Sequence, residues 1–305
     1  MPAEPACITL KNLVKSFSGH RAVDGVSFEV PSGTIFGLLG PNGAGKTTTI
    51  RMIMDIIRPD SGEISLLGRS SADGVKGQVG YLPEERGLYP KMRVLDMLEF
   101  LGAIKGMRLA DARRESASWL DRLGLGGWAQ KPVEALSKGM QQKVQLAGTV
   151  LGRPRLLILD EPFSGLDPMN QDSFKDILLE LNRDGATVIF STHQMDTAEK
   201  LCREIGLINQ GKVVLQGPLK TLKSQFGSNS VLMEFEGDGS FLRDLPGVSG
   251  VDDYGEYQEL RLEAGTDPRS LLEASMARLK IRRFEVVVPT LHNIFIEKVG
   301  KAPDA

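Results

Sequence analysis

The stretch "GPNGAGKTT", Gly40 to Thr48, decides how the first part of this chain folds. It matches the pattern GxxxxGK[ST] and lies between an apolar run, "TIFGLLG" (34–40), which predicts a strand, and apolar residues at helical spacing over 50–57. Glycines in such a loop let backbone N–H groups close around phosphates. We therefore predict a phosphate-binding loop, whose nucleotide-contacting residues are Gly40, Pro41, Asn42, Gly43, Ala44, Gly45, Lys46, Thr47 and Thr48.

Side chains with suitable chemistry occur at the ends of predicted strands. Lys46 is expected to reach the β- and γ-phosphates, and the Thr47 hydroxyl to bind Mg²⁺. Asp160 ends the apolar run "LLILD", which predicts a second Mg²⁺ ligand at the same sheet edge. Glu161 would face the other way if the strand continued, so we predict it as the general base for an attacking water. His193 ends "TVIFSTH" and is expected to contact the γ-phosphate or orient that water.

The order of predicted elements indicates an α/β fold. Runs such as "RLLILD" and "TVIFSTH" are typical of strands covered on both faces, and strands that alternate with helices imply a parallel sheet. "ITLKNLV" and "VSFEV" alternate as half-buried strands do, and residues 94–123 have a helical pattern. We therefore expect residues 1–222 to form one domain with a helical subdomain over about 91–150. Asp167 should cap a helix whose first residue is Pro168.

The character of the sequence changes near Phe226, where "FGSNS" is typical of a linker. The residues after this segment have the order strand, helix, strand, strand, helix, strand. That order predicts a small C-terminal α+β domain of ferredoxin-like type over residues 223–305.

Composition limits the possible functions. The chain has 305 residues, and its formal net charge of −2 gives no general attraction to nucleic acid, so no nucleic-acid partner is expected. Cys7 and Cys202 lack metal-ligand spacing and have apolar neighbours, which predicts buried free thiols and a reducing compartment. Neither a run of about 18 apolar residues nor an export signal is found, so we expect no membrane span.

The segment "LSKGMQQ" (136–142) predicts a helix start, with Ser137 as the cap and Gly139 leaving room above the first N–H groups. Such a helix end attracts an anion. No phosphate-binding sequence lies beside it, so its anion has to come from elsewhere.

Five motifs together give the chain a resemblance to the ATP-binding subunits of ABC transporters over residues 1 to about 222. They are the phosphate-binding loop, "LSKGMQQ", "LLILDEP", "SGLD" (164–167) and "STH" (191–193), in the family's order. The resemblance implies the P-loop ABC ATPase fold with an antiparallel β subdomain. It also implies Mg²⁺-dependent ATP hydrolysis and head-to-tail docking of two cassettes. Ser137 and Gly139 would meet the γ-phosphate bound by the second cassette, Asp167 would line the seam, and Phe17 would stack on adenine.

Two departures from the family pattern stand out. Lys138 and Met140 replace residues of the usual "LSGGQ", and Glu84 stands where the family has a glutamine that contacts the Mg²⁺ site and the membrane subunit. We expect Glu84 to belong to the nucleotide site, where its carboxylate would ligate Mg²⁺ or orient water, and to couple the nucleotide to the transport subunit. "PEERGLYP" and the C-terminal appendix are similar to an exporter branch. The expectation is therefore a transport ATPase, peripheral on the cytoplasmic side of the membrane. It would act with a polytopic permease and a second, identical cassette.

Two other classes of function compete with this one. A soluble ABC ATPase of DNA repair, translation or cofactor assembly would have two cassettes or a long coiled-coil insertion, and the sequence contains neither. A GTPase or small-molecule kinase would explain the phosphate-binding loop alone, but the guanine-reading pattern NKxD is absent. The C-terminal domain could dimerise, regulate, bind a partner or only stabilise the chain.

Overall fold

A computed structural model describes residues 6–70, 74–85, 87–225, 230–263, 265–287 and 290–299. The chain divides into two compact units, residues 1–217 and 218–305. Helix α7 (Leu219–Gln225) belongs to the second unit, so the domain boundary expected at residue 222 falls within this helix. The expected linker over 226–230 lies outside the described residues except for Ser230.

A six-stranded sheet forms the centre of the first unit, in the order β5-β6-β7-β3-β8-β9. Neighbouring strands from β5 to β8 pair in parallel, which confirms the parallel sheet predicted from the alternating elements. Every residue of β3, β6 and β7 is buried, as their unbroken apolar runs require. The strands are β3 (Ile35–Leu39), β5 (Val79–Leu82), β6 (Leu156–Asp160), β7 (Thr187–Thr192), β8 (Glu204–Asn209) and β9 (Lys212–Pro218).

An antiparallel sheet packs beside it, in the order β2-β1-β4, from β1 (Ala6–Phe17), β2 (His20–Pro31) and β4 (Ser61–Leu66). The core between the sheets includes Phe28 and Phe36, whose rings stack with centroids 5.3 Å apart. Helix α1 (Lys46–Ile53) ends earlier than the apolar spacing over 50–57 predicted. Asp55 adopts a left-handed φ of 55°, a conformation that cannot continue an α-helix and that aspartate tolerates better than most residues.

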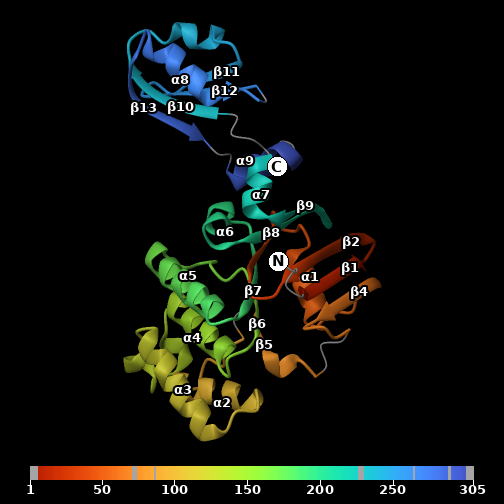
Figure 1. Ribbon diagram of the computed structural model, residues 1–305. Coiled ribbons are helices and arrows are strands. Elements are labelled where there is room, and N and C mark those ends of the chain that lie inside the picture. The colour runs from red at the N-terminus through yellow and green to blue at the C-terminus, as the bar shows by residue number, and fades with distance from the viewer. Residues whose placement is uncertain are drawn as a thin grey trace. The chain divides into compact units, whose positions relative to one another are not determined.

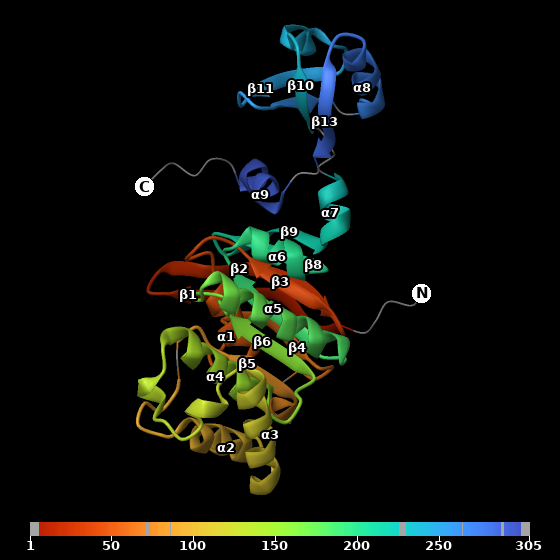
Figure 2. The same ribbon diagram turned by 90° about the vertical axis from the view of Figure 1, so that its left-hand side faces the viewer.

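Three helices form the expected helical subdomain: α2 (Val94–Ile104), α3 (Leu109–Arg122) and α4 (Lys138–Val150). In both views α2 and α3 lie at the end of this unit remote from β9 (Figures 1 and 2). Two further helices are α5 (Pro168–Arg183) and α6 (Met195–Leu201), and short 3₁₀ turns span Lys76–Gln78, Gly126–Trp128 and Val133–Ala135. Cys7 and Cys202 are buried and free, as predicted.

The second unit contains a four-stranded antiparallel sheet in the order β11-β12-β10-β13. This is the strand order of a ferredoxin-like domain, but the first predicted helix is only a 3₁₀ turn, Ser240–Asp244. Glycines at 237, 239 and 247 flank that turn and disfavour a longer helix. The other elements are β10 (Ser230–Glu236), β11 (Val248–Asp253), β12 (Gln258–Leu262), α8 (Pro268–Met276), β13 (Lys280–Val287) and α9 (Leu291–Val299).

Candidate functional site

The phosphate-binding loop connects β3 to α1, and its shape depends on two glycines. Gly40 has φ 152° and Gly45, the N-cap of α1, has φ 105°. A Cβ atom on Gly40 would lie 2.1 Å from the Ile208 carbonyl oxygen, and one on Gly45 would lie 2.4 Å from that of Ala22. Both positions therefore require glycine for space as well as for backbone angle. The loop ends at the α1 N-terminus, where free N–H groups favour an anion.

Lys46 lies inside this loop with 6% of its surface exposed. Its Nζ donates hydrogen bonds to the carbonyl oxygens of Gly40 (2.8 Å) and Pro41 (3.1 Å). The same ammonium lies 3.3 Å from Glu161 Oε1. A buried cation is thus held at the centre of the loop, beside the carboxylate that we predicted as the general base.

Asp160, at the end of β6, is fully buried. Its Oδ1 accepts hydrogen bonds from Ser191 Oγ (2.5 Å) and Thr47 Oγ1 (3.1 Å), whereas its buried Oδ2 has no hydrogen-bond partner among the described residues. Burial raises the pKa of the Asp160 carboxyl, and the two hydroxyl hydrogen bonds oppose that rise. Thr47 and Asp160 therefore come together as predicted, with one carboxylate oxygen left to accept a further ligand.

Glu161 does not continue the strand. Its φ of 47° is left-handed, a conformation that costs a residue other than glycine about 1 kcal/mol or more. Its N–H donates to Ser191 Oγ at 2.9 Å, and His193 Nδ1 lies 3.1 Å from each of its carboxylate oxygens. The strand ends at Asp160 instead of alternating onward, yet the two carboxylates do have different partners. Glu161 contacts Lys46 and His193, while Asp160 contacts Thr47 and Ser191.

The predicted caps of α4 and α5 are confirmed. Ser137 Oγ accepts from Met140 N at 3.3 Å, and Asp167 Oδ1 accepts from Asn170 N at 3.0 Å. The backbone and side chain of Asn170 hold the pKa of Asp167 below its ordinary value. A Cβ on Gly139 would lie 3.5 Å from Asn170 Nδ2, so the two helix starts are neighbours. Within the described ranges, no hydrogen bond joins these two starts to the phosphate-binding loop.

Two other predicted residues lie at strand ends. Phe17 ends β1 with 43% of its surface exposed, and Lys15 Nζ lies 5.6 Å from its ring centroid. Lys15 is fixed by Asp60 at 2.7 Å. Glu84 is exposed two residues after β5, which pairs with the Asp160 strand. Lys138, one of the departures from the family pattern, is the exposed first residue of α4.

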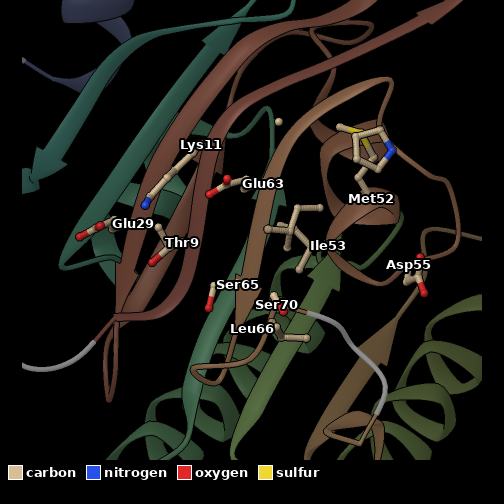
Figure 3. Close-up of a pocket in the computed structure, with 13 residues that line it drawn as sticks. Thr9, Lys11, Glu29, Met52, Ile53, Asp55, Glu63, Ser65, Leu66 and Ser70 are labelled. Carbon is tan, nitrogen blue, oxygen red and sulfur yellow. The ribbon is translucent and has the colours of Figure 1, made fainter.

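A separate cavity of about 720 Å³ lies beside the antiparallel sheet. Figure 3 shows Lys11, Glu29 and Glu63 on its strands, with Asp55 across the opening. None of the predicted site residues lines it, so it is distinct from the phosphate-binding loop.

The sequence prediction missed Ser191. Its hydroxyl joins the Asp160 carboxylate to the Glu161 backbone N–H, and its Cα partner across the sheet is Asp160. The signal was present in "STH", which ends a strand with a hydroxyl side chain. Only the pairing register of β6 with β7, however, places that hydroxyl beside the carboxylate.

Comparisons with known proteins identify the family of this chain. A family model described as ABC transporter matches residues 23–164. The uncharacterised ABC transporter ATP-binding protein YhaQ of Bacillus subtilis (strain 168) is 42% identical over 293 residues, which cover 96% of this chain and 98% of the relative. The chain belongs to the ABC transporter ATP-binding proteins. A second family model, the C-terminal domain of DrrA1-3-like ATP-binding proteins, matches residues 217–299.

Two further matches are a resistance protein and a solved structure. The daunorubicin/doxorubicin resistance ATP-binding protein DrrA of Streptomyces peucetius is 33% identical, with 97% of this chain and 93% of the relative covered. A solved structure of an ATP-binding subunit of an ABC transporter superposes with a TM-score of 0.67 at 32% identity, covering 72% of this chain and 93% of the other. The expected P-loop ABC ATPase fold is confirmed.

As an ABC ATPase, the chain binds nucleotide and serves a transporter, as these relatives do. The alternatives of a soluble repair, translation or assembly ATPase, and of a GTPase or kinase, are therefore set aside. Of the helices described, none has both the length and the apolar character needed to cross a membrane.

Proposed function

We propose that this ABC subunit hydrolyses Mg²⁺-ATP at the loop of Gly40 to Thr48 and thereby drives export through a separate membrane subunit. The observation that carries the proposal is the convergence of Lys46, Asp160, Glu161 and His193 at one edge of the parallel sheet. Phosphoryl transfer to water depends mainly on positioning and charge stabilisation, and these four side chains supply both.

The residues present fit a magnesium ion. Asp160 Oδ2 is a buried carboxylate oxygen without a hydrogen-bond donor among the described residues, and the Thr47 hydroxyl lies against the other oxygen of the same carboxylate. Mg²⁺ is commonly held by one or two carboxylates together with substrate phosphates and waters. When bound, the ion would neutralise charge on the phosphates.

Glu161 is the proposed general base. It is nine-tenths buried, and the contacts from His193 and Lys46 fix its carboxylate. On ATP binding, the Lys46 ammonium would turn from the carbonyls of Gly40 and Pro41 to the β- and γ-phosphates. Glu161 would then accept a proton from the attacking water, while His193 orients the carboxylate. Phe17 would stack on the adenine, and Glu84 would orient water near the magnesium ion.

A second cassette would complete the site. Ser137 is an exposed helix cap. Gly139 and Asp167 lie at the starts of α4 and α5, and the Asn170 side chain lies next to both residues. A triphosphate between this surface and the phosphate-binding loop of an identical chain would satisfy free N–H groups on both sides. ATP binding would then close the dimer, and hydrolysis would open it.

Exposed apolar side chains on α2 and in the segment just before it support a membrane partner. The exposed fractions are 54% for Tyr89, 41% for Phe100 and 66% for Ile104. The rings of Tyr89 and Phe100 pack edge to face, with their centroids 5.9 Å apart. Such a patch is typical of a protein interface. We place the chain on the cytoplasmic side of the membrane, bound to a polytopic permease. The export direction is inferred from the similarity to the Nod factor export ATP-binding protein I of Ralstonia nicotianae, which is 36% identical over 245 residues.

The test is the Glu161→Gln variant of the full chain, with Glu63→Gln in the separate cavity as the matched control. With Mg²⁺ and ATP, the Glu161→Gln variant should still bind ATP but should not hydrolyse it. Light scattering after gel filtration should then show this variant as a dimer. The control should hydrolyse ATP as the wild type does. A Glu161→Gln chain that remains monomeric at saturating ATP would contradict the shared site. Purification from solubilised membranes should in addition recover a stoichiometric polytopic protein.

A further inference from the structure

Two glutamines on α4 are buried although glutamine is usually exposed. Gln142 is 4% exposed and Gln145 is 6% exposed. They lie three residues apart on the helix, and each uses its side-chain amide to contact a loop outside the helical subdomain. Residues at this spacing project from the same side of an α-helix, about 4.5 Å apart along its axis.

Gln145 holds the loop that carries Glu84. Its Nε2 donates to the carbonyl oxygens of Pro83 (3.2 Å) and Glu85 (3.3 Å), which are the two residues that flank Glu84. The amide therefore fixes the backbone on both sides of Glu84 while the Glu84 side chain remains exposed.

Gln142 holds the other loop. Its Nε2 donates to the carbonyl oxygen of Pro162 at 3.2 Å, directly after Glu161. The same loop continues to Leu166, which lies beside Gly139 at the start of α4. One helix thus contacts the backbone next to Glu161 and, one turn further on, the backbone around Glu84.

Stability alone gives a poor account of Gln145. Its Oε1 is buried and accepts no hydrogen bond within the part of the chain that the structure describes. An unsatisfied buried acceptor is unfavourable, and an apolar side chain of the same shape avoids that penalty. The two hydrogen bonds that the Gln145 amide nitrogen donates to Pro83 and Glu85 explain why an amide side chain occupies this position.

We propose that Gln142 and Gln145 are positioning residues, which tie the Glu161 loop and the Glu84 loop to α4 so that a displacement of one loop reaches the other. This inference rests on the proposed roles of Glu161 and Glu84. A rigid helix turn carries the coupling, because both contacts are made by side chains of the same α-helix. Binding events at Glu84 and water activation at Glu161 would thereby be linked within one cassette.

The chain supplies a matched control in Gln141, the neighbour of Gln142 on α4. Its Nε2 also donates to backbone carbonyls, those of Val133 (3.4 Å) and Leu136 (3.1 Å), but these precede α4 and belong to neither loop. Gln141→Met, Gln142→Met and Gln145→Met each remove one amide and keep an unbranched side chain of similar length.

The first measurement is amide hydrogen exchange on the full-length variants. Gln145→Met should speed exchange about threefold or more at Glu84 and Glu85, and also at Phe163 and Ser164 in the remote loop. Gln142→Met should affect both loops as well, whereas Gln141→Met should affect neither. If Gln142→Met and Gln145→Met each change only the loop they contact, or change nothing, the coupling is refuted.

The second measurement is the Mg²⁺ concentration that gives half-maximal ATP hydrolysis. Gln145→Met should shift it about three- to tenfold, a change that a loss of folded protein alone would not produce, and Gln141→Met should leave it unchanged. If the Gln145→Met variant hydrolyses ATP and its half-maximal Mg²⁺ concentration is not shifted, the coupling inference is refuted but the proposed function is not. A wild-type chain without ATPase activity refutes the proposed function, while hydrogen exchange still decides whether the loops are coupled.

Discussion

Ser191→Ala is the substitution that most directly tests the site geometry. The hydroxyl donates a hydrogen bond to the Asp160 carboxylate at 2.5 Å and accepts one from the Glu161 N–H at 2.9 Å. A hydrogen bond to a charged group contributes about 1.5–3 kcal/mol and a neutral one about 0.5–1.5 kcal/mol. Since Ser191 and Asp160 are fully buried, water cannot replace either bond, and we expect a loss of about 2–4 kcal/mol in the free energy of unfolding.

The loss should depend on pH. Burial raises the pKa of Asp160, so the folded chain binds this proton more tightly than the unfolded chain, and the contribution of Asp160 to stability falls as pH rises through that pKa. The Ser191 hydrogen bond opposes the raised pKa, and Ser191→Ala should raise it further. The destabilisation is therefore largest where Asp160 is ionised and becomes smaller as pH falls through its pKa.

The assay is urea unfolding monitored by tryptophan fluorescence at a series of pH values from 8 downward. Both tryptophans, Trp119 and Trp128, belong to the first unit, so the signal reports only the unit that contains the site. The control is Ser116→Ala, which also removes a fully buried hydroxyl, but one without a hydrogen-bond partner among the described residues. The reasoning is refuted if Ser191→Ala destabilises the unit no more than Ser116→Ala, or equally across the whole pH series.

Three further predictions concern binding. Lys46→Ala removes the central cation of the loop and should weaken ATP binding at least about tenfold by calorimetry; unchanged affinity would exclude the loop as the phosphate site. Phe17→Ala should raise the KM for ATP about three- to tenfold with little change in kcat, because stacking on an exposed ring contributes about 1 kcal/mol; a fall in kcat alone would contradict a stacking role. When an affinity-tagged chain is purified from solubilised membranes, Phe100→Ser should reduce the amount of permease that is recovered with it and leave ATP affinity unchanged. Met276→Ser changes an exposed residue of the second unit and should not reduce that amount. Equal recovery from both variants would exclude the patch from the permease interface.

Local features of the fold could be predicted from sequence because neighbouring residues determine them. Ser137 and Asp167 cap the helices that begin after them, and the glycines of the phosphate-binding loop bend the chain where the motif predicts. The left-handed backbone of Glu161 was not predicted, since it departs from the strand pattern that precedes it. Its partners also depend on contacts with β7 and α1.

Long-range contacts account for the other omissions. Ser191 joins Asp160 only because β6 and β7 pair in that register, and the sequence pattern does not specify a register between two uniformly apolar strands. The same is true of Gln145, whose partners precede it by about sixty residues. Helix periodicity places Gln145 on α4 but does not indicate which loop its amide contacts.

The close approach of Gly40 to Ile208 has a consequence for the nascent chain. The loop appears early in synthesis, but the strand that supports it, β8, emerges 208 − 40 = 168 residues later. At about 5–20 residues per second, the ribosome needs roughly eight to thirty-four seconds to cover that interval. Until β8 emerges, β3 lacks one of its two neighbours and Gly40 lacks the Ile208 backbone against which it packs, so we expect a complete phosphate-binding loop only after β8 has emerged. Chaperone contact during that interval would protect an apolar strand, and ATP would begin to select folded molecules only after most of the cassette has left the ribosome.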